Sequence, residues 1–205
     1  MADRRGGRAA LPPESTVTAG EWEWRDLEGE EFHRVLFVDV DLMEVDVRGC
    51  RFEECTFRNT RFNASTHAES AYVNCAFVRC SFFDAAFTGC KAAGSMFDGC
   101  QYGLLKVDGG DWSFVGMPGA DLRGSVFTGV RLREADLTGA RLDGSTLRDC
   151  DLSAAWLRTA SLLECDLRGS ELGELDPNAV ALRGATVDLA QAAHLVTNLG
   201  LNVSA

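Results

Sequence analysis

The eight cysteines and three histidines are the side chains of this sequence that are best suited to bind a metal, form disulfides or act as nucleophiles. Every cysteine occupies a position divisible by five: Cys50, Cys55, Cys75, Cys80, Cys90, Cys100, Cys150 and Cys165. No cysteine–histidine spacing resembles a zinc site. Alanine and serine fill the same positions elsewhere in the chain, so we interpret the cysteines as reduced, small core residues. We expect no metal site, no disulfide and no cofactor.

The cysteines belong to a five-residue period that runs through most of the chain. Two residues after each small position stands a large apolar residue, in a series that runs in steps of five from Trp22 to Leu172. Only His67 and Ala92 interrupt the series, which includes all but two of the twelve phenylalanines. This period matches neither an α-helix, with about 3.6 residues per turn, nor a flat strand, with about two. It is typical of a chain that turns a corner every five residues.

Four such sides form a square coil of about twenty residues, and coils stack through backbone hydrogen bonds about 4.8 Å apart. Each coil buries its apolar residues only against its neighbours, so the stack gains stability as it grows. Glycine recurs two residues after the large residue, as at Gly49 and Gly129, where a corner needs a backbone that glycine adopts easily. The sequence therefore predicts an all-β solenoid over residues 21–187, with about eight coils and a length of about 38 Å.

The histidines and the remaining motifs do not indicate catalysis. His67 occupies an inward position, where a histidine with satisfied hydrogen bonds is the simpler interpretation. His33 points outward beside acidic residues, and His194 falls near the end of the chain. No glycine-rich phosphate loop, nucleophile elbow or pair of catalytic carboxylates stands out. We do not expect an enzyme.

The two ends of the chain depart from the period. Residues 1–20 are rich in Arg, Gly and Pro and are predicted to be a disordered tail. Residues 188–205 are predicted to form a short α-helix and tail, with Asp188 as N-cap and Gly200 as the stop signal. This helix either covers the last coil or pairs with a second copy, and both uses can coexist. We favour a homodimer through its apolar residues Leu189, Ala192, Ala193, Val196 and Leu199.

The tail lacks the apolar segment of a secretory signal, and no run of about eighteen apolar residues exists. With its reduced thiols, this favours a cytoplasmic protein without a membrane span. The net charge of −11 argues against direct binding of nucleic acid, which needs a basic surface. It favours a well-solvated surface or one that competes with DNA for a basic groove. A duplex about 38 Å long carries roughly 22 charges, so the rod has about half that charge density.

The outward positions offer two candidate contact surfaces. Acidic residues are densest near the start of the solenoid, and those selected as candidate partner contacts are Glu28, Asp41, Glu44, Asp121 and Asp136. One side has an unusually apolar exterior, on which Val78, Met96 and Trp156 are candidate contacts. Solubility alone would also explain the acidic residues, and a flat sheet would also explain the apolar side. The stretch between Tyr102 and Trp112 is the least regular, and we expect a bend or bulged corner there.

Several repeats spell a known motif. Residues 120–124 (ADLRG), 135–139 (ADLTG) and 165–169 (CDLRG) resemble the A(D/N)LxG motif of pentapeptide repeat proteins, over roughly residues 20–189. The resemblance implies a right-handed quadrilateral β-helix. Residues 119–133 and 182–188 look most like the mycobacterial fluoroquinolone-resistance branch of this family. Members of that branch are dimers through C-terminal helices and DNA-shaped rods that bind DNA gyrase where DNA would lie.

The resemblance implies a DNA-mimicking inhibitor of type II topoisomerase that modulates gyrase and confers resistance to quinolones or other gyrase inhibitors. The related Qnr proteins carry loops that project from the rod, for which the unbroken period here leaves no room. If such loops are needed for protection, this chain binds or inhibits gyrase without protecting it well. The alternative is a scaffold or regulatory protein that binds a different partner through the apolar side.

Overall fold

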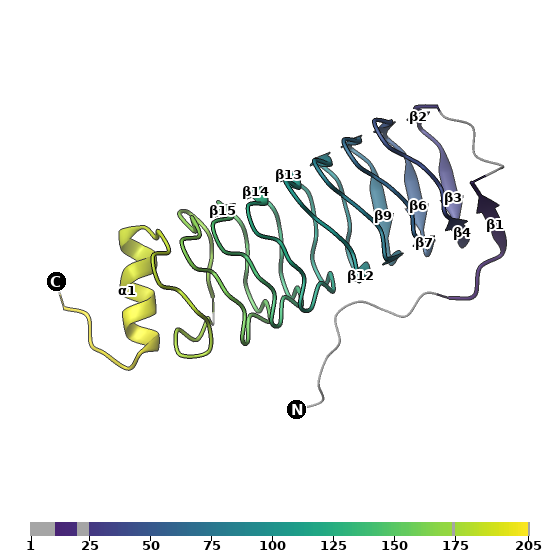
Figure 1. Ribbon diagram of the computed structural model, residues 1–205. Helices are drawn as coiled ribbons and strands as arrows, with labels where there is room; N and C mark the ends of the chain where they lie inside the picture. The colour runs from purple at the N-terminus through teal and green to yellow at the C-terminus, as the bar shows by residue number, and fades with distance from the viewer. Residues whose placement is uncertain (1–10, 20–24, 174, 205) are drawn as a thin grey trace.

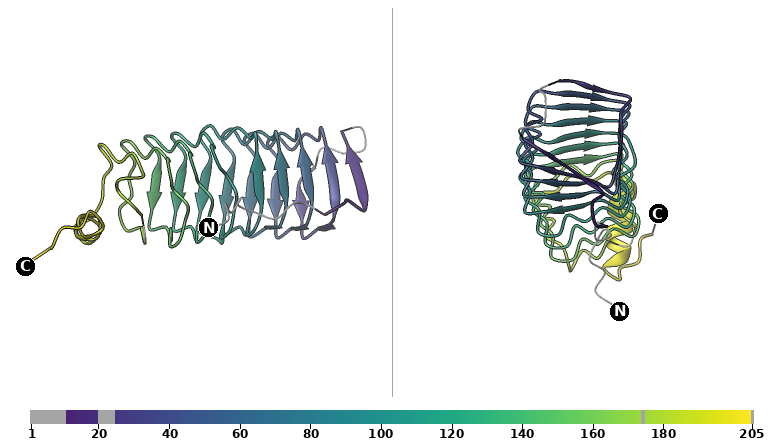
Figure 2. Two further views of the ribbon diagram at one scale, coloured as in Figure 1. Left: turned by 90° about the horizontal axis from the view of Figure 1, so that it is seen from below. Right: turned by 90° about the vertical axis from the view of Figure 1, so that its right-hand side faces the viewer.

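A computed structural model describes residues 11–19, 25–173 and 175–204, which form a rod of stacked four-sided coils with one helix at its C-terminal end (Figures 1 and 2). Trp22, the first large residue of the predicted series, lies outside the described residues. Within each coil the chain passes over four sides, called here faces D, B, C and A in chain order. The predicted β-solenoid with a short C-terminal α-helix is confirmed.

Parallel strands from successive coils form three of the four faces. Face A contains β1 (Ser15–Thr18), β4 (Val35–Val38), β7 (Thr56–Arg58), β10 (Ala76–Val78) and β12 (Met96–Asp98). Face B contains β2 (Leu27–Glu28), β5 (Asp46–Arg48), β8 (Thr66–Ala68), β11 (Ala86–Thr88), β13 (Lys106–Asp108), β14 (Val126–Thr128) and β15 (Thr146–Arg148). Face C contains β3 (Glu31–His33), β6 (Arg51–Glu53) and β9 (Ala71–Val73). Face D is held by isolated bridges, such as Asp41↔Arg61 and Arg61↔Ser81.

The strands account for slightly fewer coils than predicted. Face B has one strand per coil, and its seven strands define about six turns. Single bridges from Thr146 to Asp166, and from Asp166 to Thr186, continue the ladder toward the C-terminus. The last coils therefore stack through isolated bridges rather than strands, which explains the difference from the eight coils expected.

The predicted disorder of residues 1–20 is wrong for part of this segment. Residues 15–18 form β1, which pairs in parallel with β4 so that Val17 lies beside Phe37. Val17 is partly buried against the core, because it stands twenty residues before Phe37 and continues the same period. The repeat therefore begins one side earlier than Trp22. Residues 1–10 and 20 lie outside the described residues.

The predicted corners adopt a left-handed backbone. Gly49 has φ 60° and Gly129 has φ 64°. Many residues with side chains take the same conformation at equivalent corners, including Asp39 at φ 58° and Glu44 at φ 59°. Such residues cost more strain than glycine, but the cross-coil ladder on either side fixes the corner.

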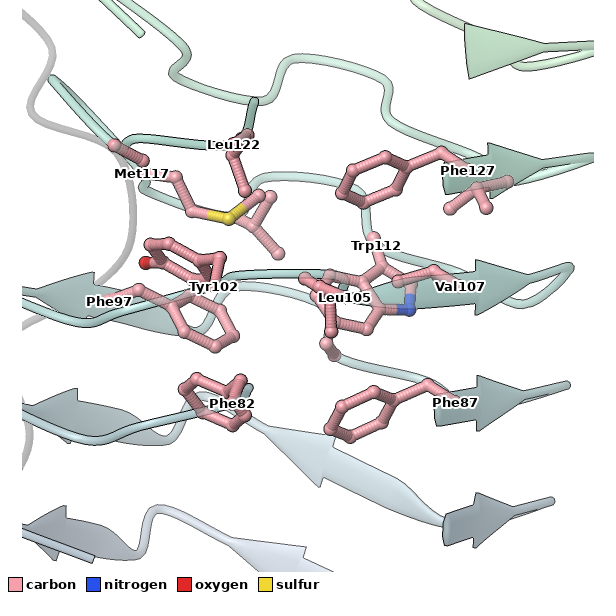
Figure 3. Packing of buried hydrophobic residues seen from close by; sticks show 14 of the residues in the cluster. Phe82, Phe87, Phe97, Tyr102, Leu105, Val107, Trp112, Met117, Leu122 and Phe127 are labelled. Atoms are coloured by element: carbon pink, nitrogen blue, oxygen red, sulfur yellow. The ribbon is translucent and has the colours of Figure 1, made fainter. Parts of the chain in front are cut away.

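Stacked aromatic rings fill the first half of the rod. Phe37, Phe57 and Phe77 lie in one stack, with ring centroids 4.8 and 5.0 Å apart. This separation is the distance between hydrogen-bonded coils, so the ladder and the rings have the same repeat. Figure 3 shows the transition from rings such as Phe82 to aliphatic side chains such as Leu122.

The cross-coil ladder is interrupted on face D at this transition. Elsewhere the amide at the large residue donates to the next coil, as from Phe82 to the carbonyl of Gln101 at 2.8 Å. Among the described residues, no such bond joins Tyr102 to Asp121, and the amide of Asp121 has no bond back to Cys100. The ring of Tyr102 lies 5.9 Å from that of Phe82, against 4.9 Å one coil earlier. We call this break, between residues 99–104 and 118–123, the seam.

The seam modifies the expectation of a bend or bulge at residues 102–112. The repeat itself is not shifted, because Asp111 still bridges Lys91 on one side and Arg131 on the other. The side chains differ across the seam, since the rings of Phe97 and Tyr102 lie on one side and Met117 and Leu122 on the other (Figure 3). The backbone ladder is thus open where the core side chains change from aromatic to aliphatic, without an inserted residue.

The helix α1 (Leu189–Asn198) covers the last coil with polar side chains. Gln191 is buried, and its Nε2 donates to the carbonyls of Leu167 and Ser170 at 2.6 and 2.7 Å. Asn198 Nδ2 donates to the carbonyl of Leu175 at 3.0 Å. Asp188 is the N-cap as predicted, in a capping box with Gln191. The carbonyls of Ser170 and Leu175 thereby gain donors that no further coil supplies, and the carbonyl of Leu167 gains a second donor beside the amide of Ser170.

Among the described residues, no helix has both the length and the apolar character needed to cross a membrane.

Candidate partner-binding surfaces

Three of the five acidic candidates lie on two neighbouring faces in the N-terminal half of the rod, and Asp121 and Asp136 lie further along it. Glu28 lies exposed on β2 of face B, while Asp41 and Glu44 share one side of face D. Asp121 is also on face D, four coils further along, and it is exposed. The structure therefore brings Asp41 and Glu44 together but leaves Asp121 at a distance.

The prediction that Asp136 is an exposed contact residue is wrong. It lies on face A with 6 % of its surface exposed, and its Oδ1 accepts a hydrogen bond from the amide of Thr138 at 3.0 Å. Its side chain therefore turns back on the backbone of its own corner. An aspartate at this repeat position can either point into solvent or accept a hydrogen bond from the amide two residues further on. The sequence position alone does not distinguish these two conformations.

Ion pairs neutralise part of the acidic surface. Asp41 pairs with Arg61 in the next coil, and Asp121 pairs with Arg123 at 2.6 Å and lies 3.8 Å from Arg141. The hydrogen bond from Arg123 lowers the pKa of Asp121. Within the described part of the chain, Glu28 and Glu44 have no basic partner within 4 Å and are exposed. These two are the stronger candidates for contacting a basic partner.

Face A differs from the other three in charge. Its outward positions carry the exposed or half-exposed acidic residues Asp39, Asp98 and Asp176, besides the buried Asp136, and three basic residues, Arg58, Arg79 and Arg158. The excess negative charge of the rod therefore lies on faces B, C and D. A basic partner would be attracted to those faces and not to face A.

The apolar candidates on face A form a broken stripe. Val78 and Met96 are half-buried on the neighbouring strands β10 and β12. Trp156 is 36 % exposed but lies three coils beyond Met96, with Gly116 and Asp136 between them. Only Val78 and Met96 therefore belong to one continuous patch.

Two exposed apolar residues on face D were not among the predicted contacts. Phe83 and Leu104 are each 52 % exposed, and Phe83 lies over Gly103, where a Cβ would come within 3.0 Å of the ring. Both stand at outward positions that are mostly polar elsewhere. Phe83 is also one of the two phenylalanines outside the five-residue series, and that departure was the signal that could have indicated it.

The predicted dimer residues on α1 remain uncovered in the single chain. Leu189 is 91 % and Leu199 48 % exposed, while Ala192, Ala193 and Val196 are half-buried. The helix contacts the last coil mainly through Gln191, Asn198 and the partly buried Leu195. The capping role and an apolar outer face therefore coexist on one helix.

The core histidine and the cysteines take the structural roles expected of them. The ring of His67 is buried and lies 2.8 Å from Ser65 Oγ and 2.7 Å from Tyr72 Oη. Burial lowers the pKa of His67 to about 3, against a smaller opposing effect of Asp46. All eight cysteines are free thiols, and burial raises the pKa of Cys90 to about 11. No group of three potential metal ligands is found among the described residues.

The fold and the family comparison agree. Residues 118–149 match the model for pentapeptide repeats, in eight copies. Residues 118–149 therefore consist of pentapeptide repeats, and the coils on either side follow the same five-residue period. No curated protein matches the sequence.

Solved structures that this chain matches include a trypsin-treated form of QnrB1, a plasmid-mediated fluoroquinolone resistance protein. It is 22 % identical, with 93 % of this chain and 97 % of that chain covered and a TM-score of 0.46. Full-length QnrB1 is also 22 % identical, with 91 % and 100 % covered and a TM-score of 0.35. HetL, involved in heterocyst differentiation regulation in the cyanobacterium Nostoc, is 15 % identical, with 78 % and 88 % covered and a TM-score of 0.48. At these values the likenesses assign no function to this chain.

Proposed function

We propose that this protein is a DNA-mimicking rod that binds type II topoisomerase, DNA gyrase in particular, in place of a DNA segment. The observation that carries the proposal is the distribution of charge: the negative excess surrounds the rod on three faces and extends along its length. A basic groove shaped for a duplex would be complementary to such a surface. The motif resemblance to gyrase-binding pentapeptide repeat proteins supports this choice of partner. On this proposal the protein is a binding protein of the cytoplasm and not an enzyme.

The N-terminal half of the rod is the part best suited to this contact. Glu28 and Glu44 project from faces B and D without ion pairs among the described residues, so their charge is available to a partner. Asp41 is paired with Arg61, but an exposed pair of this kind contributes little to stability and can be exchanged for a partner's cation. Modulation of gyrase, and resistance to quinolones or other inhibitors, would follow from competition with DNA.

A homodimer through α1 would double the length of the mimic. Two copies related by a two-fold axis would bring Leu189 and Leu199 of each helix against the other helix, burying the most exposed apolar residues of that helix. Two rods of about 38 Å would then form one particle about twice as long. Sedimentation should give twice the monomer mass, and Leu189→Glu with Leu199→Glu should give the monomer.

The experiment is a gyrase supercoiling assay with titrated protein. The intact protein should inhibit supercoiling or protect gyrase from a quinolone at micromolar concentration. The double variant Glu28→Lys with Glu44→Lys should act about tenfold more weakly, equivalent to about 1.4 kcal/mol. Asp98→Lys, which reverses an exposed charge on face A, is the matched control and should act like the intact protein. Absence of both inhibition and protection would refute the proposal.

Face A supports a second candidate function, that of a scaffold for a different protein. Its balanced charge and the half-buried pair Val78 and Met96 would suit an apolar partner. Val78→Asp with Met96→Asp should then abolish partner binding in a folded protein, while Glu28→Lys with Glu44→Lys leaves it intact. The reverse result favours the DNA mimic.

A further inference from the structure

At the seam, one of two stacked cysteines is only partly buried. Cys100 is the only cysteine that is not fully buried, and it lines a hollow of about 450 Å³ together with Gln101, Tyr102, Gly103, Asp121 and Arg123. Cys80 lies directly behind it, one coil earlier, because the amide of Gln101 donates to the carbonyl of Cys80 at 3.0 Å. The pair therefore has one partly buried cysteine at the hollow and one fully buried cysteine next to it.

We propose that Cys80 and Cys100 form an oxidisable dithiol, in which a peroxide reaches Cys100 through the seam and Cys80 then completes a disulfide. Neighbouring coils are about 4.8 Å apart, within the range of about 4.4–6.8 Å between the Cα atoms of a disulfide. Both thiols now point the same way, toward the carbonyls of Phe57 and Phe77 at 3.4 Å. One side chain must therefore rotate before the bond can form.

The seam permits that rotation at Cys100. Where the ladder is intact, the carbonyl of a stacked cysteine accepts a hydrogen bond from the next coil. The carbonyl of Cys75, for example, accepts from the amide of Met96 at 2.9 Å. The carbonyl of Cys100 receives no such bond from Asp121 among the described residues. Residue 100 can move without breaking a cross-coil hydrogen bond there. A hydrogen bond with Cys80 also lowers the pKa of Cys100, which favours the reactive thiolate.

The chemistry proceeds in two balanced steps. The Cys100 thiolate attacks one peroxide oxygen, so that an S–O bond forms, the O–O bond breaks and hydroxide leaves; sulfur is oxidised and the peroxide is reduced. The Cys80 sulfur then attacks the Cys100 sulfenic acid. The S–S bond forms, the S–O bond breaks, and the oxygen leaves as water with the proton of Cys80.

The chain contains its own control. Cys55 and Cys75 are stacked one coil apart in the same way, and hydrogen bonding between them lowers the pKa of Cys55. Both are fully buried, and the ladder around them is unbroken. If thiol stacking alone were sufficient, the two pairs would react alike. If access through the seam decides, only Cys80 and Cys100 would react.

The test is to treat the folded protein with hydrogen peroxide and to locate disulfides by mass spectrometry without reduction. The Cys80–Cys100 bridge should form at least about tenfold faster than any bridge between Cys55 and Cys75. Cys80→Ser should leave a sulfenic acid on Cys100 that dimedone traps, and serine is tolerated there because Ser95 and Ser125 fill equivalent positions. Equal oxidation of both pairs, or oxidation of Cys100 without bridging to Cys80, would overturn the proposal.

Discussion

The stability of the rod should fall as the pH drops below about 6.5, because of the buried histidine His67. Its ring is stacked on Phe87 at 4.3 Å in the aromatic core. Ser65 Oγ donates to the carbonyl of Phe62 at 2.6 Å, so it accepts from Nε2–H of His67. Nδ1 is then the acceptor for the hydroxyl of Tyr72 at 2.7 Å. Every polar atom of this network is satisfied only when the ring is neutral.

The size of the effect follows from the lowered pKa of His67, about 3 in the fold against 6.5 for an ordinary histidine. Below pH 6.5 the unfolded chain takes up a proton that the folded chain does not, so stability is lost as the pH falls toward 3. At pH 5 the loss amounts to about 2 kcal/mol relative to pH 8. Above pH 6.5 both states are neutral at this position, and its contribution to stability no longer changes.

The assay is urea unfolding between pH 8 and pH 5, for the intact protein and for His67→Phe with Tyr72→Phe. The double variant removes the titrating ring together with the hydroxyl that would lose its acceptor, and it extends the phenylalanine stack. All other residues are the same in the two proteins, so their contributions cancel in the comparison. The intact protein should lose about 2 kcal/mol more than the variant over this range. Equal losses in the two proteins would refute the neutral, buried state of His67.

Three further predictions follow from the ladder and its ends. Gln191→Ala should lower the free energy of unfolding by about 1–3 kcal/mol, because the carbonyl of Ser170 loses its donor while that of Leu167 keeps the amide of Ser170; a loss below about 0.5 kcal/mol in urea unfolding would contradict the capping role. Hydrogen exchange should be faster at the amides of Tyr102 and Asp121 than at Phe82, whose amide is bonded across the coils; equal protection would mean that the seam is closed in solution. Gly110→Ala should destabilise the rod by about 1–3 kcal/mol in thermal unfolding, since a Cβ there would lie 2.0 Å from the carbonyl oxygen of Cys90 at a φ of 87°; an unchanged melting temperature would show that the corner can relax.

The repeat could be predicted from sequence because one physical rule applies at every coil. A large side chain at each fifth residue must pack on those twenty residues before and after it, so Phe37, Phe57 and Phe77 reveal both the period and the face they share. The start of the repeat was harder to predict, because Val17 is smaller than most residues of the series and is followed by a polar segment. The seam could not be located to a face, because the mismatch between rings and leucines acts through the whole coil.

The outward surface was less predictable, because the same residue type at the same repeat position can be either exposed or buried. Asp121 and Asp136 stand at equivalent positions of their repeats, yet the first is exposed and the second buried. Their difference depends on the neighbouring coils: Arg141 lies beside Asp121, whereas Trp156 follows Asp136 on the same face. Such differences come from residues twenty positions away. They appear only when the faces are assembled.

Displacement of DNA from gyrase tests the central proposal most directly. A labelled duplex bound to gyrase is titrated with the intact protein, and fluorescence anisotropy reports the bound fraction. DNA mimicry predicts full displacement at micromolar protein, an affinity that falls with added salt, and about tenfold weaker competition by Glu28→Lys with Glu44→Lys but not by Asp98→Lys. A duplex that stays bound at all protein concentrations, or competition that these charge reversals leave unchanged, would contradict it.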